Sequence, residues 1–123
     1  MTISEVSRLY NISADTLRYY EKAGMIPPVG RTDGGIRDYG EADCSWVELA
    51  ICLRSAGLSV EAIAEYVRLS LEGEDTITPR LLLLKEQREL LMGKYEKMRL
   101  AMERLDYKIL KYEQAQKSGV LEW

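Results

Sequence analysis

Two thiols and no imidazole limit the chemistry that this 123-residue chain can perform. A chain without histidine lacks the usual general base, the Ser-His-Asp and Cys-His catalytic groups and most zinc sites. Cys44 and Cys52 are separated by about 12 Å along a helix, too far to chelate one ion together. An iron–sulfur cluster needs about four thiolates. We therefore expect no enzyme, no metal site and no cofactor.

Arginines beside turn signals are the better candidates for binding chemistry. Arg18 lies on a short predicted helix, and Arg31 and Arg37 flank an Asp-Gly-Gly turn. Two arginines on one small hairpin favour a polyanionic ligand such as DNA. For Arg18 the alternative is a surface ion pair with Asp15 or Glu21.

The distribution of charge argues against a broadly basic DNA-binding surface. Residues 1–40 are neutral, residues 41–78 carry eight acidic and two basic side chains, and residues 79–123 carry ten basic and seven acidic ones. The net charge is −3. Because phosphate contacts drive most nucleic-acid binding, DNA recognition here must rest on a few well-placed arginines.

The N-terminal residues predict two short helices joined by a tight turn. Thr2 and Glu5 form a capping-box pattern ahead of a helix of about two turns. Ser13 can cap a second helix over 14–23, which Gly24 ends. This is the helix-turn-helix pattern.

Further elements follow this pair. Residues 31–39 predict a hairpin wing, and residues 42–56 a helix whose apolar face is Trp46, Leu49, Ala50 and Leu53. Ser59 can cap another helix, or bind phosphate at its N-terminus. Residues 73–76 read as a polar connector.

The longest predicted helix begins at Thr78-Pro79, with a cap and a proline in the first turn. From Leu81 to Tyr112, steps of three and four residues define a heptad seam that includes Arg88. A helix of some 38 residues reaches roughly 57 Å, so the seam needs a partner helix. We expect dimerisation through Leu84, Leu91, Tyr95, Met98, Met102, Leu105, Ile109 and Tyr112.

Together these elements predict a mainly α fold: a winged helix-turn-helix head with a small β-hairpin wing, plus a long C-terminal coiled-coil dimerisation helix. We expect a DNA-binding domain over 1–75, a dimerisation helix over 76–117 and a short tail over 118–123, with no separate effector domain. No apolar stretch approaches the roughly 20 residues of a membrane span, and the N-terminus lacks a secretion signal. A cytoplasmic protein is expected.

The sequence resembles the head of a MerR-family transcription regulator. The resemblance rests on the ordered motifs TLRYYE (16–21), GMI (24–26) with Pro28, the set Arg31, Gly35, Arg37 and Tyr39, and LRSAGLS (53–59) with Ile63. It extends over nearly the whole chain. One departure is Ile36, where members commonly carry an aromatic residue.

The resemblance implies an antiparallel homodimer that binds a near-palindromic promoter and distorts the double-stranded DNA, so that RNA polymerase is affected indirectly. The second helix would enter the major groove, and the wing would reach phosphate or the minor groove. Tyr39 either packs the wing or binds phosphate, and either Tyr19 or Tyr20 faces the core. The expected DNA-binding residues are Thr16, Arg18, Tyr19, Tyr20, Arg31, Arg37, Tyr39 and Ser59.

Cys52 is either an inert core thiol or a sensor. A lone cysteine in this segment and the missing effector domain resemble the aldehyde-responsive subgroup typified by AdhR and NmlR. Arg54 would favour a thiolate at Cys52, and Glu48 would oppose it. For Cys44 a packing role is expected.

Two other functions stay open from the sequence. One is a MerR-like repressor with no effector, and the other is a coiled-coil adaptor that binds protein and not DNA. The neutral head and acidic middle segment fit the adaptor.

Overall fold

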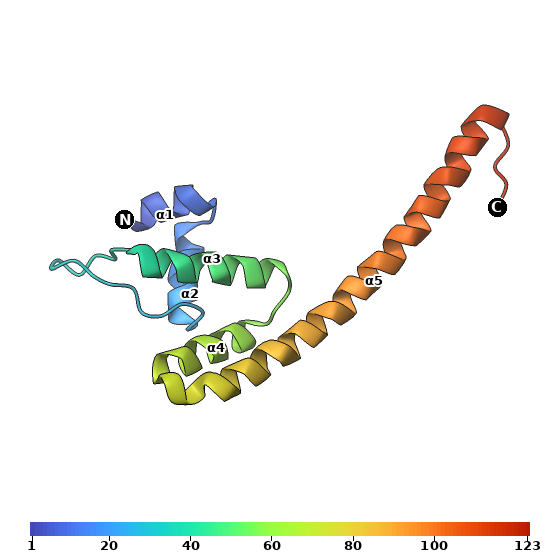
Figure 1. Ribbon diagram of the computed structural model, residues 1–123. Coiled ribbons are helices and arrows are strands. Elements are labelled where there is room, and N and C mark those ends of the chain that lie inside the picture. Colours follow the sequence, from blue (N-terminus) through green and yellow to red (C-terminus); the bar gives the residue numbers. More distant parts are fainter. The chain divides into compact units, whose positions relative to one another are not determined.

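The computed structural model describes residues 1–123 and is mainly helical (Figure 1). Its α-helices are α1 (Ile3–Tyr10), α2 (Ala14–Lys22), α3 (Glu41–Ser55), α4 (Val60–Glu72) and α5 (Ile77–Ser118), with a short 3₁₀ helix η1 (Glu74–Thr76) between α4 and α5. No helix is long and apolar enough to cross a membrane. The predicted mainly α fold with a long C-terminal helix is confirmed.

The first helix pair begins where the capping residues predict. Thr2 and Glu5 form the full capping box: the Glu5 N–H donates to Thr2 Oγ1 over 3.1 Å, and the Thr2 N–H donates to Glu5 Oε1 over 2.9 Å. Ser13 Oγ caps α2 by accepting from the Thr16 N–H. Asn11 ends α1 in a left-handed conformation (φ 52°), which turns the chain sharply into α2.

One apolar core holds α1–α4 together. Its buried members come from each of these helices and from the chain between α2 and α3: Val6, Leu17, Tyr20, Met25, Ile26, Val29, Tyr39, Val47, Ala50 and Ile63. The predicted inner face of α3 is partly wrong. Val47 and Ala50 are buried, whereas Leu49 is exposed, because the inward-facing side of the helix is centred on Val47 and Ala50, one residue later than the predicted Trp46 and Leu49.

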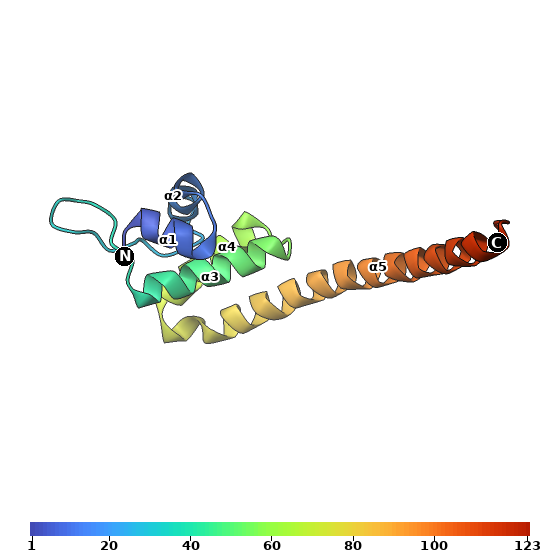
Figure 2. The ribbon, with the colours of Figure 1, turned by 90° about the horizontal axis from the view of Figure 1, so that it is seen from above.

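The predicted β-hairpin wing is a loop with a single antiparallel bridge between Arg31 and Arg37. The Thr32 N–H donates to the Ile36 carbonyl over 2.8 Å, and Gly35 adopts φ +81° in the turn. On the outer side of the bridge the Asp38 N–H donates to the Gly30 carbonyl over 2.7 Å, and the pairing ends there because the Tyr39 N–H donates to the Met1 carbonyl instead. The loop projects from the helices of the head in both views (Figures 1 and 2).

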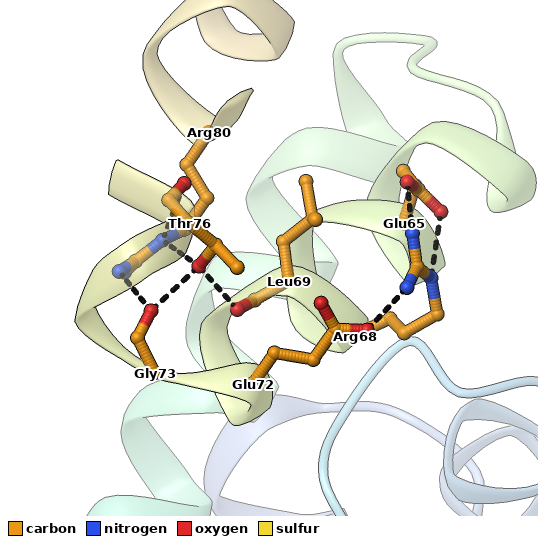
Figure 3. Close-up of polar contacts among 7 residues, drawn as sticks. All are labelled: Glu65, Arg68, Leu69, Glu72, Gly73, Thr76 and Arg80. Atoms are coloured by element: carbon orange, nitrogen blue, oxygen red, sulfur yellow. Dashed lines mark hydrogen bonds and ion pairs between the residues drawn. The ribbon is translucent and has the colours of Figure 1, made fainter. Parts of the chain in front are cut away.

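A polar cluster joins the end of α4 to the start of α5 (Figure 3). The Thr76 hydroxyl is buried and lies 2.6 Å from the Leu69 carbonyl and 2.7 Å from the Gly73 carbonyl. Arg80 donates from Nε to Thr76 Oγ1 over 3.0 Å and from Nη2 to the Gly73 carbonyl over 3.1 Å. We call these residues the elbow.

The elbow corrects the predicted start of the long helix. Thr78 does not cap α5, because the helix already begins at Ile77, and Pro79 is its third residue. The sequence pattern of a cap followed by proline pointed to the wrong threonine. The capping threonine is Thr76, and its hydroxyl bonds carbonyl groups at the end of α4 rather than N–H groups at the start of α5.

The chain divides into two compact units, Met1–Gln87 and Arg88–Trp123. No residue of α5 is buried. Most of the seam residues are exposed large hydrophobic side chains. The division at 75 and 117 stays a prediction.

Candidate nucleic-acid interface

The exposed face of α2 carries the polar residues expected to meet DNA. Leu17 and Tyr20 are buried, so the face between them, with Arg18 and Tyr19, is turned to solvent. The Arg18 side chain is 49% exposed, and its Nη1 donates to Asp15 Oδ1 over 2.8 Å. Thr16 is half-buried, and its hydroxyl lies 2.7 Å from Ser13 Oγ. Such an exposed ion pair stabilises a fold by well under about 1 kcal/mol, which leaves Arg18 free to change partner.

The two adjacent tyrosines have opposite surroundings. Tyr20 packs in the core, and burial raises the pKa of its hydroxyl. Tyr19 is half exposed on the same face as Arg18. Successive helical residues point about 100° apart, so only one ring can face inward, and Tyr19 is the one available to a ligand.

Glu21 connects α2 to the wing loop, a role that the sequence analysis missed. Its Oε1 accepts from Arg37 Nε over 2.7 Å and lies 3.8 Å from Arg31 Nη2. Its Oε2 accepts from the Val29 N–H over 2.8 Å. Both wing arginines therefore lie beside one carboxylate. Glu21 is the acidic residue of the TLRYYE motif (16–21), in which the sequence analysis considered Arg18 as the DNA contact. Its negative charge, together with two arginines in the wing loop, was the signal that could have predicted this ion pair.

The environment of Glu21 favours its ionised form. Burial works to raise the pKa, but hydrogen bonds from Arg37 and the Val29 N–H, with the charges of Arg37 and Arg31, hold the pKa of Glu21 below its ordinary value. A carboxylate that accepts charge-assisted hydrogen bonds at partial burial is a strong local anchor. It sets the position of the loop relative to α2.

Tyr39 lies at the base of the wing loop and is 1% exposed. Its hydroxyl is enclosed and has no hydrogen-bond partner in the structure. Burial raises its pKa. Of the two roles left open by the sequence, packing of the loop is the one that this conformation shows.

Ser59 begins α4 and is exposed, and its Oγ accepts from the Ala62 N–H over 3.1 Å. The capping role is therefore present. Contacts to DNA by Ser59 and the other site residues stay predictions.

The two cysteines differ in exposure. Cys52 is exposed on α3, so it is not a core thiol, whereas Cys44 is half-buried. Arg54, expected to assist a thiolate, donates from Nη1 to the Leu58 carbonyl over 2.8 Å. No cluster of three or more metal-ligating side chains is present.

Cys44 lines an open pocket of about 600 Å³ between α1 and α3. Tyr10 and Glu48 line the same pocket, and the Tyr10 hydroxyl donates to Glu48 Oε1 over 2.8 Å. Loss of water contact raises the pKa of Tyr10 well above its ordinary value, and the hydrogen bond to Glu48 adds to the shift. The pocket was not expected from the sequence, because its residues are far apart in the chain.

The chain is similar in sequence to known transcriptional regulators. Residues 1–70 match the MerR HTH family regulatory protein model. The chain is 48% identical over 92 residues to the HTH-type transcriptional regulator AdhR of Bacillus subtilis, a match over 75% of this chain and 66% of AdhR. It is 32% identical over 118 residues to an HTH-type transcriptional regulator of Haemophilus influenzae, covering 96% of this chain and 87% of the relative.

Solved structures agree with these relatives. A MerR family regulator from Listeria monocytogenes superposes with a TM-score of 0.91 at 42% identity, covering 96% of this chain and 92% of that chain. HiNmlR, a MerR family regulator lacking the sensor domain and bound to promoter DNA, superposes with a TM-score of 0.86 at 32% identity, covering 98% and 95%. The chain belongs to the MerR family of helix-turn-helix transcriptional regulators.

Proposed function

We propose that this regulator binds promoter DNA as a homodimer, with α2 in the major groove and the wing loop against the backbone. The observation that carries the proposal is the likeness of nearly the whole chain to HiNmlR, which is solved on promoter DNA. The exposed Arg18 and Tyr19 on α2 fit base-edge and phosphate contacts. Arg31, 45% exposed, supplies a further cation on the loop.

A gel-shift titration on the protein's own upstream DNA, at two salt concentrations, tests this function. Each neutralised phosphate contributes a slope of about −0.9 to a plot of log K against log salt concentration. Few arginines face outward on the head, so we expect specific binding with a moderate slope. An adaptor without a DNA role would show no specific shift even at low salt.

The seam on α5 supports a dimer in an antiparallel arrangement. The steps of three and four residues between seam positions are the same from Leu81 towards the C-terminus as from Tyr112 towards the N-terminus. Each seam residue of one copy therefore faces a seam residue of an antiparallel second copy. A parallel in-register pair would instead place Arg88 against the partner's Arg88, two like charges in one apolar seam. The antiparallel layers are Leu81 with the partner's Tyr112, Leu84 with the partner's Ile109, Arg88 with the partner's Leu105, Leu91 with the partner's Met102, and Tyr95 with the partner's Met98.

Two heads related by a twofold axis match a near-palindromic site. Bending or untwisting a site of this size costs roughly 1–6 kcal/mol, which the contacts of both heads must repay. We propose that the dimer acts on RNA polymerase indirectly, through this distortion. Circular-permutation mobility of the bound promoter measures the bend, and a straight complex would exclude this mechanism.

We propose that an electrophile such as an aldehyde switches the regulator at Cys52. The exposed thiol and the 48% identity to AdhR support this. The thiolate sulfur attacks the carbonyl carbon, the C–O π pair becomes an alkoxide, and the alkoxide takes a proton from water. The product is a hemithioacetal, and no oxidant is required.

Mass spectrometry after exposure to methylglyoxal tests the switch, with the half-buried Cys44 as an internal control. We expect the adduct at Cys52 and a Cys52→Ser variant that binds DNA but no longer responds. An unmodified Cys52 and a variant that responds as the wild type does would exclude Cys52 as the switch, and a wild type that does not respond would be an effector-independent regulator.

A further inference from the structure

An aromatic cluster is formed at the end of α5 by the C-terminal tail. The tail turns back at Gly119 (φ +81°), whose N–H donates to the Ala115 carbonyl (Figure 1). The Trp123 ring meets Tyr112 edge-on with centroids 5.8 Å apart, and its centroid lies 6.4 Å from that of Tyr107. Lys108 Nζ lies 3.7 Å from the Trp123 centroid.

This cluster is organised but largely uncovered, since Trp123 is 57% exposed and both tyrosines are about half exposed. Aromatic side chains of this size are the commonest anchors of protein interfaces. An exposed tryptophan held in place by ring and cation contacts loses little further entropy on docking. The cluster therefore has the properties of an interface anchor.

A hollow of about 230 Å³ lies between α4 and the first turns of α5, and we call it the head groove. It is lined by Tyr66, Ile77, Arg80, Leu81 and Leu84. The Tyr66 ring is backed by Trp46 at 6.1 Å. Its aliphatic members are about half exposed, so the groove is an apolar surface next to the start of the seam.

We infer that the aromatic cluster of one copy docks into the head groove of its partner. This rests on the antiparallel dimer proposed above. In that arrangement Tyr112 is in the same layer as the partner's Leu81, and Leu81 lines the head groove. The rings packed on Tyr112 then lie directly beside the partner's groove, as a continuation of the seam.

The charges of the two surfaces agree with this contact. Lysines surround the cluster, with Lys108 over Trp123 and Lys111 over Tyr107. The partner's residues 41–78 carry a net charge of −6. Within this segment α4 has three glutamates against Arg68, a net charge of −2, and Arg68 pairs with Glu65 and Glu72. Complementary charge favours this orientation over a contact between two basic helix ends.

Photocrosslinking of the full-length protein tests the contact. p-Benzoylphenylalanine is introduced in place of Trp123, and the protein is made in light and ¹⁵N-labelled form, mixed under dissociating conditions and refolded together. We expect mixed light–heavy crosslinks from position 123 to the peptide containing residues 66–84. Crosslinks that are only intrachain, or none to that peptide, would overturn the inference.

The same crosslinker at Tyr95 separates this inference from the dimer on which it rests. We expect Tyr95 to reach the partner's Met98 region. If position 95 crosslinks between chains and position 123 does not reach the head groove, only the tail contact is wrong. If position 95 gives no interchain product, the proposed dimer itself fails.

A substitution measures how much the contact contributes. Trp123→Ala should weaken dimerisation roughly tenfold or more, as loss of an interface anchor does. Val120→Ala, on the same tail but outside the ring contacts, should leave the dimer dissociation constant within about twofold. Equal constants for the two variants in analytical ultracentrifugation would contradict a docking role for Trp123.

Discussion

At the residue scale, the arginines of the head belong to two groups that sequence alone does not separate. Arg37 is held by Glu21 at 2.7 Å with its side chain only 23% exposed, so its first role is to position the wing loop. Arg18 is bound only by the exposed Asp15. The cost of transferring Arg18 to DNA is therefore small, and that of transferring Arg37 includes the loss of a partly buried ion pair.

Replacing Arg18 with alanine is expected to reduce operator affinity by roughly 1–3 kcal/mol, the range for a specific base contact. Stability should change by less than about 0.5 kcal/mol, since the ion pair lost is exposed. Fluorescence anisotropy and thermal unfolding measure the two quantities. Asp15→Asn is the matched control, because it removes the same ion pair and leaves Arg18 in place. Equal operator affinities for the two variants would show that Arg18 does not contact the bases.

Replacing Glu21 with glutamine is expected to destabilise the head by about 2 kcal/mol, since hydrogen bonds to a charged group are lost at a partly buried site. The pKa of Glu21 is lowered by folding from an ordinary value of 4.5. Its stabilisation is therefore complete above pH 4.5 and is lost as the pH falls through the lower folded value.

Urea unfolding at about pH 7 and about pH 3 checks this sign. The difference between wild type and Glu21→Gln should be large at the higher pH and shrink at the lower one. Glu5→Gln, in the capping box of α1, serves as a comparison at an exposed carboxylate. A difference for Glu21→Gln that does not depend on pH would show that its charge is not the source of the stabilisation.

At the element scale, the elbow replaces the basic residue that the last turn of α4 lacks. Carbonyl groups at the end of a helix need donors, and the negative end of the helix dipole favours a cation. Both come from the following residues, the hydroxyl from Thr76 and the guanidinium from Arg80 (Figure 3). The start of α5 is thereby tied to the end of α4.

Thr76→Val is expected to cost about 1–3 kcal/mol, because it keeps the shape but removes a buried hydroxyl that contacts the Leu69 carbonyl. Thr76→Ser, which retains the hydroxyl, should recover most of the loss. Chemical denaturation gives the free energies, and hydrogen exchange of amides near the end of α4 locates the effect. If valine and serine behave alike, the hydroxyl does not hold the elbow.

At the scale of the whole molecule, an α5 without buried residues explains why a single copy is incomplete. The seam exposes large apolar side chains over many turns, more than a soluble monomer normally leaves uncovered. In the proposed dimer a second copy buries them and brings two DNA-binding heads onto one twofold axis. Dimerisation and operator recognition are therefore expected to fail together.

Tyr95→Asp tests this coupling. Tyr95 and the partner's Met98 form the layer nearest the proposed twofold axis, so one substitution places two carboxylates near the middle of the interface. We expect monomers in sedimentation and a loss of operator affinity of at least about a hundredfold, with the fold of the head unchanged by circular dichroism. Lys97→Glu, which adds a carboxylate outside the seam, should remain dimeric. A dimeric Tyr95→Asp variant would contradict the seam.

Local signals determined most of the helices. A capping hydroxyl, a glycine with positive φ and apolar spacing act over one or two turns, so Thr2, Ser13 and the seam from Leu81 to Tyr112 could be read without a structure. Local signals also gave a wrong prediction at Thr78. A threonine followed by proline predicted the start of the long helix there, whereas α5 already begins at Ile77.

The tertiary structure decided which groups meet. Glu21 lies beside Arg37, sixteen residues away in sequence, and Tyr10 donates to Glu48, thirty-eight residues away. Whether Cys52 was buried, and which of Tyr19 and Tyr20 faced inward, depended on how α2 and α3 rotate against one core. The sequence of a segment sets its own backbone hydrogen bonds, but burial and ion pairing arise only when separate segments share one volume.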